Sequence, residues 1–160
     1  MYWTILIMAV LILAGAVFLG EQRNKRLVDE GKIIKRKVSF VETAEIFTLK
    51  DADYSKLIHG LKAMDISGTG VSWEGYSAKQ LVAFRSSHGW SAQLSLDEKN
   101  EDIYKYRFQF TKWQTRKGAI WRIDTMNMLL TSIEKAFLSL DSSTQVETEL
   151  LKLKTRSKFF

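Results

Sequence analysis

The chain of 160 residues contains no cysteine, no proline and only two histidines. Without cysteine the protein can form no disulfide, use no thiol nucleophile and bind no metal through thiolates. The missing thiols also fit a reducing compartment. His59 is expected on the polar side of a helix and His88 in a hairpin turn, and neither position suggests a partner that would orient a general base. We therefore predict no catalytic residue.

Phosphate-binding and metal-binding signatures are missing as well. Gly68-Thr69-Gly70 is not followed by the Gly-Lys-Ser/Thr of a phosphate-binding loop. An acidic stretch lacks the regular spacing of a calcium loop and is predicted to be a solvated hairpin loop; it comprises Asp97, Glu98, Glu101 and Asp102. The sequence thus predicts no cofactor and no metal site.

The first part of the chain has no charged side chain from Tyr2 to Leu19. A bilayer core requires about 20 apolar residues in a helix, so residues 1–20 are predicted to form a single transmembrane helix. A cleaved signal peptide is the alternative, with Ala14-Gly15-Ala16 as its cleavage site. No Lys or Arg precedes the run, and cleavage would leave apolar residues at the new N-terminus, so we expect an uncleaved anchor.

The residues that flank this run predict its orientation. Arg23, Lys25 and Arg26 follow it directly, whereas the other side offers only the amino terminus. Since positive residues favour the cytoplasmic side, the rest of the chain is predicted to be cytoplasmic, at the inner membrane if the organism is bacterial. Tyr2 and Trp3 are then expected at the opposite membrane interface.

Two small residues suggest a contact between copies of this helix. Ala16 and Gly20 have the small-xxx-small spacing that brings membrane helices together, which makes a homodimer one hypothesis. The alternative is that small residues are simply common in membrane helices.

The net charge of +6 is concentrated at the two ends of the chain. Residues 21–37, a basic juxtamembrane segment, and residues 152–160, a basic tail, each carry about +4, which leaves the intervening domain slightly acidic. This distribution argues against nucleic-acid binding, which requires a basic domain surface. The tail is interpreted either as a frayed terminus or as a lipid-contacting segment with the residues Lys154, Arg156, Lys158, Phe159 and Phe160.

Residues 38–151 are predicted to form one α+β domain with an antiparallel meander of four to five strands and helices packed on one face. Apolar residues at helical spacing predict helices over residues 51–64 and from Asp124, an expected N-cap, to Leu140. Alternation predicts strands around Val71–Trp73, Val82–Phe84, Trp90–Leu96 and Tyr104–Phe110, and a short fifth strand at Ala119–Ile123. Thr144 and Glu147 suggest the capping box of a last helix.

The segment 32–49 is ambiguous between one strand and two. Val38, Phe40, Ala44 and Ile46 share one alternating face there, which favours strand structure.

The most regular alternation separates the two faces of the sheet. Tyr104, Tyr106, Phe108 and Phe110 are expected in the core, because they share the apolar face. The residues between them predict a polar face that is solvated or, if it binds anything, meets a protein partner or an anionic surface, with Lys105, Arg107 and Gln109 as the candidate contact residues.

Three classes of function remain open. The first and favoured one is a non-enzymatic single-pass membrane protein whose cytoplasmic domain binds a protein partner, as an assembly or scaffold subunit or as an exclusion or immunity factor that blocks a translocation machine. The second is an enzyme with a site scattered among Asp, Glu, Ser and Tyr residues. The third is a sensor or binder of a small anionic ligand that uses Arg85, Lys105 or Arg107.

Overall fold

A computed structural model describes residues 2–151, without the side chains of residues 2–5 and 13–17. The chain forms two compact units, Met1–Lys35 and Arg36–Phe160. The tail residues for which lipid contact is predicted lie outside the described residues.

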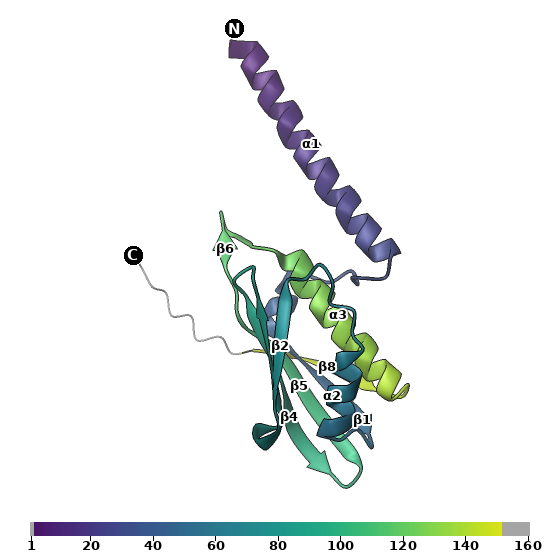
Figure 1. The fold of residues 1–160 in the computed structure, drawn as a ribbon. Coiled ribbons are helices and arrows are strands. Elements are labelled where there is room, and N and C mark those ends of the chain that lie inside the picture. The colour runs from purple at the N-terminus through teal and green to yellow at the C-terminus, as the bar shows by residue number, and fades with distance from the viewer. Residues whose placement is uncertain (1, 152–160) are drawn as a thin grey trace, which may run out of the picture. The chain divides into compact units, whose positions relative to one another are not determined.

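The first unit is built on α1 (Tyr2–Asp29), a helix of 28 residues (Figure 1). Its sequence lacks proline and is rich in Leu and Ala, which favour the helix. The helix ends just before Gly31, whose φ of +65° suits glycine. Among the described residues, no helix combines the length and the apolarity that crossing a membrane demands. The predicted transmembrane helix is therefore unsupported.

The second unit is an α+β domain around one antiparallel sheet with the strand order β2-β3-β4-β5-β1-β8. Its strands are β1 (Thr43–Lys50), β2 (Val71–Tyr76), β3 (Leu81–Ser86), β4 (Ser91–Asn100), β5 (Ile103–Lys112) and β8 (Gln145–Leu150). The α+β class and the antiparallel meander are confirmed. The predicted number of strands is too small, because six strands form the sheet.

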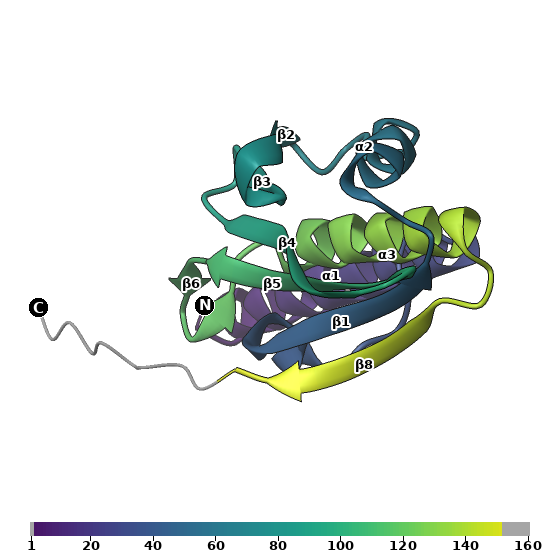
Figure 2. The ribbon, with the colours of Figure 1, turned by 90° about the horizontal axis from the view of Figure 1, so that it is seen from below.

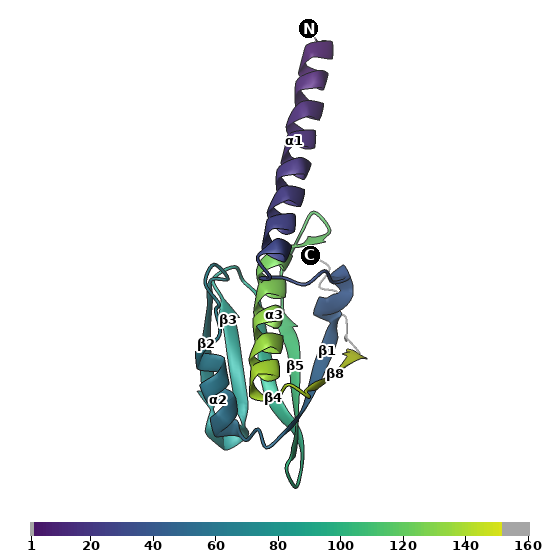
Figure 3. The same cartoon turned by 90° about the vertical axis from the view of Figure 1, so that its right-hand side faces the viewer.

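Both helices of this unit, α2 (Tyr54–Lys62) and α3 (Ile123–Leu140), lie on the same face of the sheet (Figures 2 and 3). In α2 the carboxylate of Asp53 caps the helix by accepting a hydrogen bond from the amide of Lys56 at 2.9 Å. In α3 the N-cap is Arg122, with a φ of +58°, and not Asp124 as predicted. Asp124 lies in the first turn instead, where a negative charge suits the helix dipole.

The core lies between the sheet and these helices and is largely aromatic. Tyr104, Tyr106, Phe108 and Phe110 are buried, as the alternation predicts. Phe137 of α3 stacks on Phe47 of β1 with ring centroids 4.4 Å apart. Such burial of large apolar surfaces supplies most of the stability of a domain of this size.

The ambiguous segment contains one strand, preceded by the 3-10 helix η1 (Val38–Glu42). Of the four residues predicted to share one alternating face, only Ala44 and Ile46 lie in this strand. Phe47 and Leu49 face the core, and Ile46 lies opposite Arg107 of the polar face. The shared face fails because η1 interrupts the period of 2 and leaves Val38 64% exposed.

The predicted last helix is wrong as well, since Gln145–Leu150 form β8. The hydroxyl of Thr144 donates to the carbonyl of Asp141 at 2.6 Å, and so completes the end of α3 in place of capping a new helix. β8 then pairs along β1 from Thr43 to Thr48 and satisfies the backbone groups on that side of β1.

The remaining elements connect the strands. The 3-10 helix η2 (Ser77–Lys79) joins β2 to β3, and the turn that begins at Ser86 joins β3 to β4. Asp97 and Glu98 belong to β4, so the predicted acidic loop is reduced to the turn Glu101–Asp102. The expected fifth strand is the short β7 (Ala119–Ile120), which pairs with β6 (Thr115–Arg116) outside the main sheet.

Candidate functional site: an open sheet face

The face of the sheet opposite α2 and α3 is polar and keeps part of its surface in water. Lys105, Arg107 and Gln109 lie on this face, as predicted, and are half-buried. The strand register places Gln93 and Ser95 of β4 beside Gln109 and Arg107. We name this surface the open face; it carries the side chains of Ser72, Glu74, Ala83, Arg85, Gln93, Ser95, Ala44, Ile46, Thr48, Lys105, Arg107, Gln109, Gln145, Glu147 and Glu149.

Arg107 connects three strands across the open face. Its Nη2 atom lies 2.7 Å from Oε2 of Glu149 on β8 and 3.4 Å from Oδ2 of Asp97 on β4. The ion pair with Glu149 passes over β1, where the small residue Ala44 lies opposite Glu149 and is fully buried. The hydrogen bond to Glu149 raises the pKa of Arg107 above its ordinary value.

Lys105 forms a second ion pair on this surface. Its Nζ atom lies 2.8 Å from Oε2 of Glu98. The hydrogen bond raises the pKa of Lys105 and lowers the pKa of Glu98. Lys105 and Arg107 are thus engaged in ion pairs, whereas Arg85 of the open face forms none with the residues that the structure describes.

A second group of polar side chains is buried on the other side of β1. Nη1 of Arg36 donates to Oε1 of Glu45 at 3.2 Å, and Nε donates to Oδ1 of Asn127 at 3.0 Å. Nη2 of Arg36 also pairs with Glu134 of α3. The hydroxyl of Thr131 donates to Asn127 at 3.3 Å and completes the group, which we name the Arg36 cluster.

The Arg36 cluster holds two carboxyl groups around one guanidinium. Glu45 is only 5% exposed, and its Oε2 atom is buried without a hydrogen-bond partner among the described residues. Burial and the neighbouring charge of Glu134 raise the pKa of Glu45 to about 7, although Arg36 acts in the opposite direction. The groups bind one another between β1 and α3, so we interpret the cluster as part of the packing of the domain.

The residues predicted at the membrane lie on α1. Tyr2 and Trp3 form its first turn, and Arg23, Lys25 and Arg26 are exposed near its end. Arg26 pairs with Glu30 one turn later, at 3.0 Å.

The small residues predicted to form a dimer contact also lie on this helix. The side chain of Ala16 is not among those described. A Cβ added at Gly20 would meet nothing within 4 Å, so no described neighbour requires glycine there. A contact with a second copy stays a prediction.

The two histidines lie as predicted, one on a helix and one in a turn. His59 is exposed on α2, and His88 lies in the turn between β3 and β4. Among the described residues no group of three or more His, Cys, Asp or Glu side chains is placed to hold a metal ion.

Sequence reasoning missed two features. The first is the Arg36 cluster, because Arg36 falls in the predicted juxtamembrane segment 21–37 and no partner was predicted for it or for Glu45. The available signal was Glu45, which alternates in step with Phe47 and Leu49 and so falls on the same side of the strand as these apolar residues. The second is a contact within the hairpin β6–β7, where Cζ of Arg116 lies 3.8 Å from the ring centroid of Trp121.

No family model, curated protein or solved structure matches the chain.

Proposed function

We propose that this protein is a non-enzymatic, membrane-tethered module whose α+β domain binds a protein partner through the open face. The observation that carries the proposal is the one-sided architecture of the sheet. Helices α2 and α3 cover one face (Figure 3), while the strands carry the polar side chains of the open face on the other. Antiparallel sheets commonly keep one face in water, and a broad, ordered surface of this kind can also receive a protein.

The membrane part of the proposal is supported by the uncharged run from Tyr2 to Leu19. On α1 its described apolar side chains are between 54% and 67% exposed, which is costly in water; they are Leu6, Ile7, Met8, Val10, Leu11, Ile12, Phe18 and Leu19. Arg23, Lys25 and Arg26 favour a cytoplasmic position for the domain. The basic tail 152–160 is proposed as an additional lipid contact on the strength of its sequence alone.

Two experiments test this placement. If the first segment is embedded in lipid, the protein remains in the membrane fraction after alkaline carbonate extraction; recovery in the supernatant would contradict the anchor.

A reporter fused after Phe160 is expected to be active in the cytoplasm. Reporter activity restricted to an exported compartment would contradict this orientation. Adding Lys residues before Tyr2 while neutralising Arg23, Lys25 and Arg26 should weaken the preference for a cytoplasmic domain.

A protein partner is favoured over a small anionic ligand by the ion pairs on the open face. Lys105 already binds Glu98, and Arg107 already binds Asp97 and Glu149. A small anion at Lys105 or Arg107 would have to displace these carboxylates and leave them unpaired. A protein can instead add its own contacts around the existing pairs, since exposed charges at an interface mainly set specificity and association rate.

Photo-crosslinking in cells tests the partner face. A photoreactive amino acid in place of Gln93 or Gln109, which lie opposite each other on β4 and β5, is expected to give one discrete crosslinked product. The matched control is the same substitution at Lys62, which is exposed on α2. Charge reversal by Arg107→Glu should abolish the product at Gln93. Equal products from Lys62 and Gln93, or none from the open face, would contradict the proposal.

The partner then distinguishes the two forms of the proposed role. A scaffold subunit is expected to be required for assembly of the complex that it crosslinks to. An exclusion or immunity factor is expected to leave assembly intact, and its deletion should release activity of that complex.

A further inference from the structure

The hairpin β6–β7 forms a basic projection beside the main sheet. From Lys112 to Arg122 the chain carries four basic residues and no acidic one. Lys112, Arg116 and Lys117 are exposed and form no ion pair with any residue in the described range 2–151, whereas Arg122 lies 3.4 Å from Asp124. This segment is therefore cationic within a domain that is slightly acidic as a whole.

An ordered aromatic ring accompanies these charges. Trp121 is 38% exposed, and the guanidinium of Arg116 stacks over its ring at 3.8 Å. The amide of Trp121 donates to the carbonyl of Gln114 at 2.8 Å, which fixes the backbone at the base of the hairpin. An amphipathic ring held next to cations suits the interface between lipid headgroups and acyl chains, where Trp is enriched.

The hairpin lies at the end of the domain where the chain enters and leaves it. β5 runs into the hairpin at Lys112, and the antiparallel register places the start of β1 and the end of β8 at that same end. The amide of Leu151 donates to the carbonyl of Glu42 at 3.0 Å, which joins the exit of the chain to its entry through η1. We name this end the hairpin end (Figure 1).

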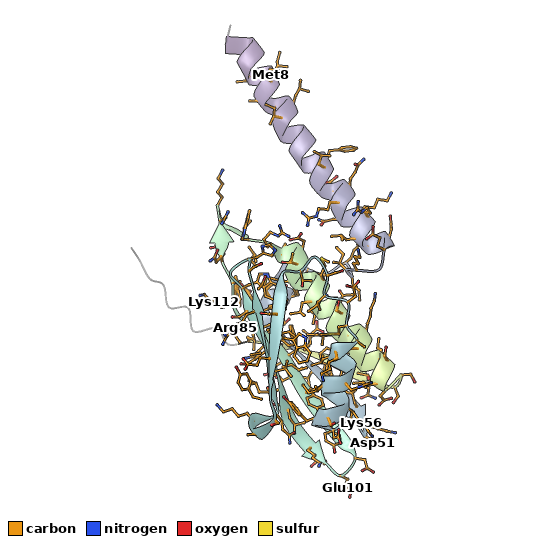
Figure 4. The ribbon with its side chains drawn as sticks, viewed as in Figure 1. Met8, Asp51, Lys56, Arg85, Glu101 and Lys112 are labelled. Carbon is orange, nitrogen blue, oxygen red and sulfur yellow. The ribbon has the colours of Figure 1, made fainter. Side chains whose placement is uncertain are left out.

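The opposite end of the domain is acidic. Three of its connections, residues 51–53, 101–102 and 141–144, carry five carboxylates and no basic residue: Asp51, Asp53, Glu101, Asp102 and Asp141. The fourth connection there contains Lys79, and Nζ of Lys56 on α2 pairs with Oδ2 of Asp51 at 2.6 Å. Figure 4 shows Asp51 and Glu101 at this end and Lys112 toward the hairpin. An anionic surface would thus attract the hairpin end more strongly than the acidic end.

We propose that the hairpin end docks on an anionic lipid surface, with Lys112, Arg116 and Lys117 at the phosphates and Trp121 in the headgroup layer. The choice of lipid rests on the membrane placement proposed above, because the apolar run 2–19 brings the domain close to a bilayer. A basic hairpin with an aromatic ring could also stack on nucleic-acid bases, and the test includes that outcome.

Each basic residue at an anionic membrane adds about 1 kcal/mol of attraction, which corresponds to roughly a fivefold change in a binding equilibrium. The double variant Arg116→Gln/Lys117→Gln should therefore reduce docking by about 25-fold. Lys62→Gln/Lys79→Gln removes the same charge from exposed positions of α2 and η2 and is expected to leave docking unchanged.

The experiment uses the full chain in lipid nanodiscs, and the lack of cysteine allows clean labelling at single introduced thiols. Spin labels are attached at Thr115→Cys in the hairpin, Glu101→Cys at the acidic end and Leu11→Cys in the apolar run. In discs with about 30% phosphatidylserine the hairpin label should be accessible to lipid-soluble oxygen, and about 1 M salt or neutral phosphatidylcholine discs should return it to water. The Glu101 label should stay in water throughout.

The outcomes separate the two proposals. A hairpin label that stays in water while the Leu11 label lies in lipid overturns the docking inference and leaves the anchor standing. A Leu11 label in water overturns the membrane placement itself. Protection of the hairpin label by an oligonucleotide, with no response to anionic discs, overturns the choice of lipid. Far-ultraviolet circular dichroism of each variant shows whether the domain is folded, and the salt response of the unaltered hairpin provides a test that needs no charge variant.

Discussion

Replacing Glu45 by glutamine should change how the stability of the domain depends on pH. Glu45 is buried on β1 beside Glu134, and Arg36 contacts both carboxyl groups. Glutamine keeps the shape of the side chain and its ability to accept a hydrogen bond from Arg36, but it cannot ionise. The substitution therefore isolates the effect of the ionised carboxylate in this buried position.

The size of this change in the free energy of unfolding follows from the pKa of Glu45, which rises from its ordinary value of 4.5 in the unfolded chain to about 7 in the fold. The folded state then binds more protons than the unfolded state between these values, so the free energy of unfolding falls as pH rises. Between about pH 5 and pH 8 the loss is about 2–3 kcal/mol. The lowered pKa values of Glu98 and Asp141 act mainly below this range, in the opposite direction.

Urea unfolding of the full chain in detergent, followed by tryptophan fluorescence at pH 5 and pH 8, measures this difference. With a denaturant dependence of about 1–3 kcal/mol per molar, the midpoint of the wild type should fall by about 1–2 M between the two pH values. The Glu45→Gln variant should match the wild type at pH 5 and exceed it at pH 8. Glu147→Gln, on the exposed edge strand β8, is the matched control and should follow the wild type.

The competing interpretation predicts the opposite sign. If Arg36 held Glu45 ionised, the removal of one partner of a buried ion pair would cost about 3–5 kcal/mol at neutral pH. A Glu45→Gln variant that is less stable than the wild type at pH 8, or a wild type that is more stable at pH 8 than at pH 5, would refute the reasoning.

Three further predictions concern stability and use the same urea assay. Phe137→Ala should cost about 3–5 kcal/mol because it empties the space beside Phe47, and a loss below about 1 kcal/mol would mean that the core is assigned wrongly. Arg107→Ala should cost less than about 1 kcal/mol, since its ion pairs are exposed, and a greater loss than for Phe137→Ala would contradict the strand register. Asp53→Ala should cost about 1 kcal/mol through loss of the α2 cap, whereas Asp53→Asn should retain most of it.

The helices and the central strands could be predicted from the sequence because their apolar residues repeat with one period. In α3 the stripe from Met126 to Phe137 is buried as expected. In β5 the aromatic residues alternate with polar ones over the whole strand, so the period alone separates the core from the open face. Local pattern and tertiary environment agree at these positions.

The edge of the sheet could not be predicted in the same way. All six residues of β8 are exposed, so the strand has no apolar face that a period of 2 could reveal. The Thr144 hydroxyl and Glu147 imitate a capping box in sequence. What decides the structure is the unpaired side of β1, which a distant segment must cover, and that requirement is not visible locally.

The buried acid on β1 shows a second limit. Glu45 occupies a core position because Arg36 and Asn127, distant in sequence from each other, lie beside it in the fold. Sequence periodicity predicts charged residues on solvated faces. A charged residue in the core is stable only when a partner distant in sequence binds it there. The candidate partner face was predictable for the converse reason, since Lys105 and Arg107 follow the alternation.

The two proposals together make a last prediction about the direction in which the open face points. With the hairpin end at the headgroups, β5 leads from Ile103, far from the bilayer, to Lys112, near it. The open face then points sideways, so its partner should be a membrane protein that stands beside this one. Lys105 and Gln109 are four residues apart, which at about 3.4 Å per residue separates them by roughly 14 Å along this direction. Photo-crosslinks from Gln109 should therefore map closer to the partner's membrane segments than those from Lys105. A reversed order, or a partner with no membrane segment, would refute this orientation.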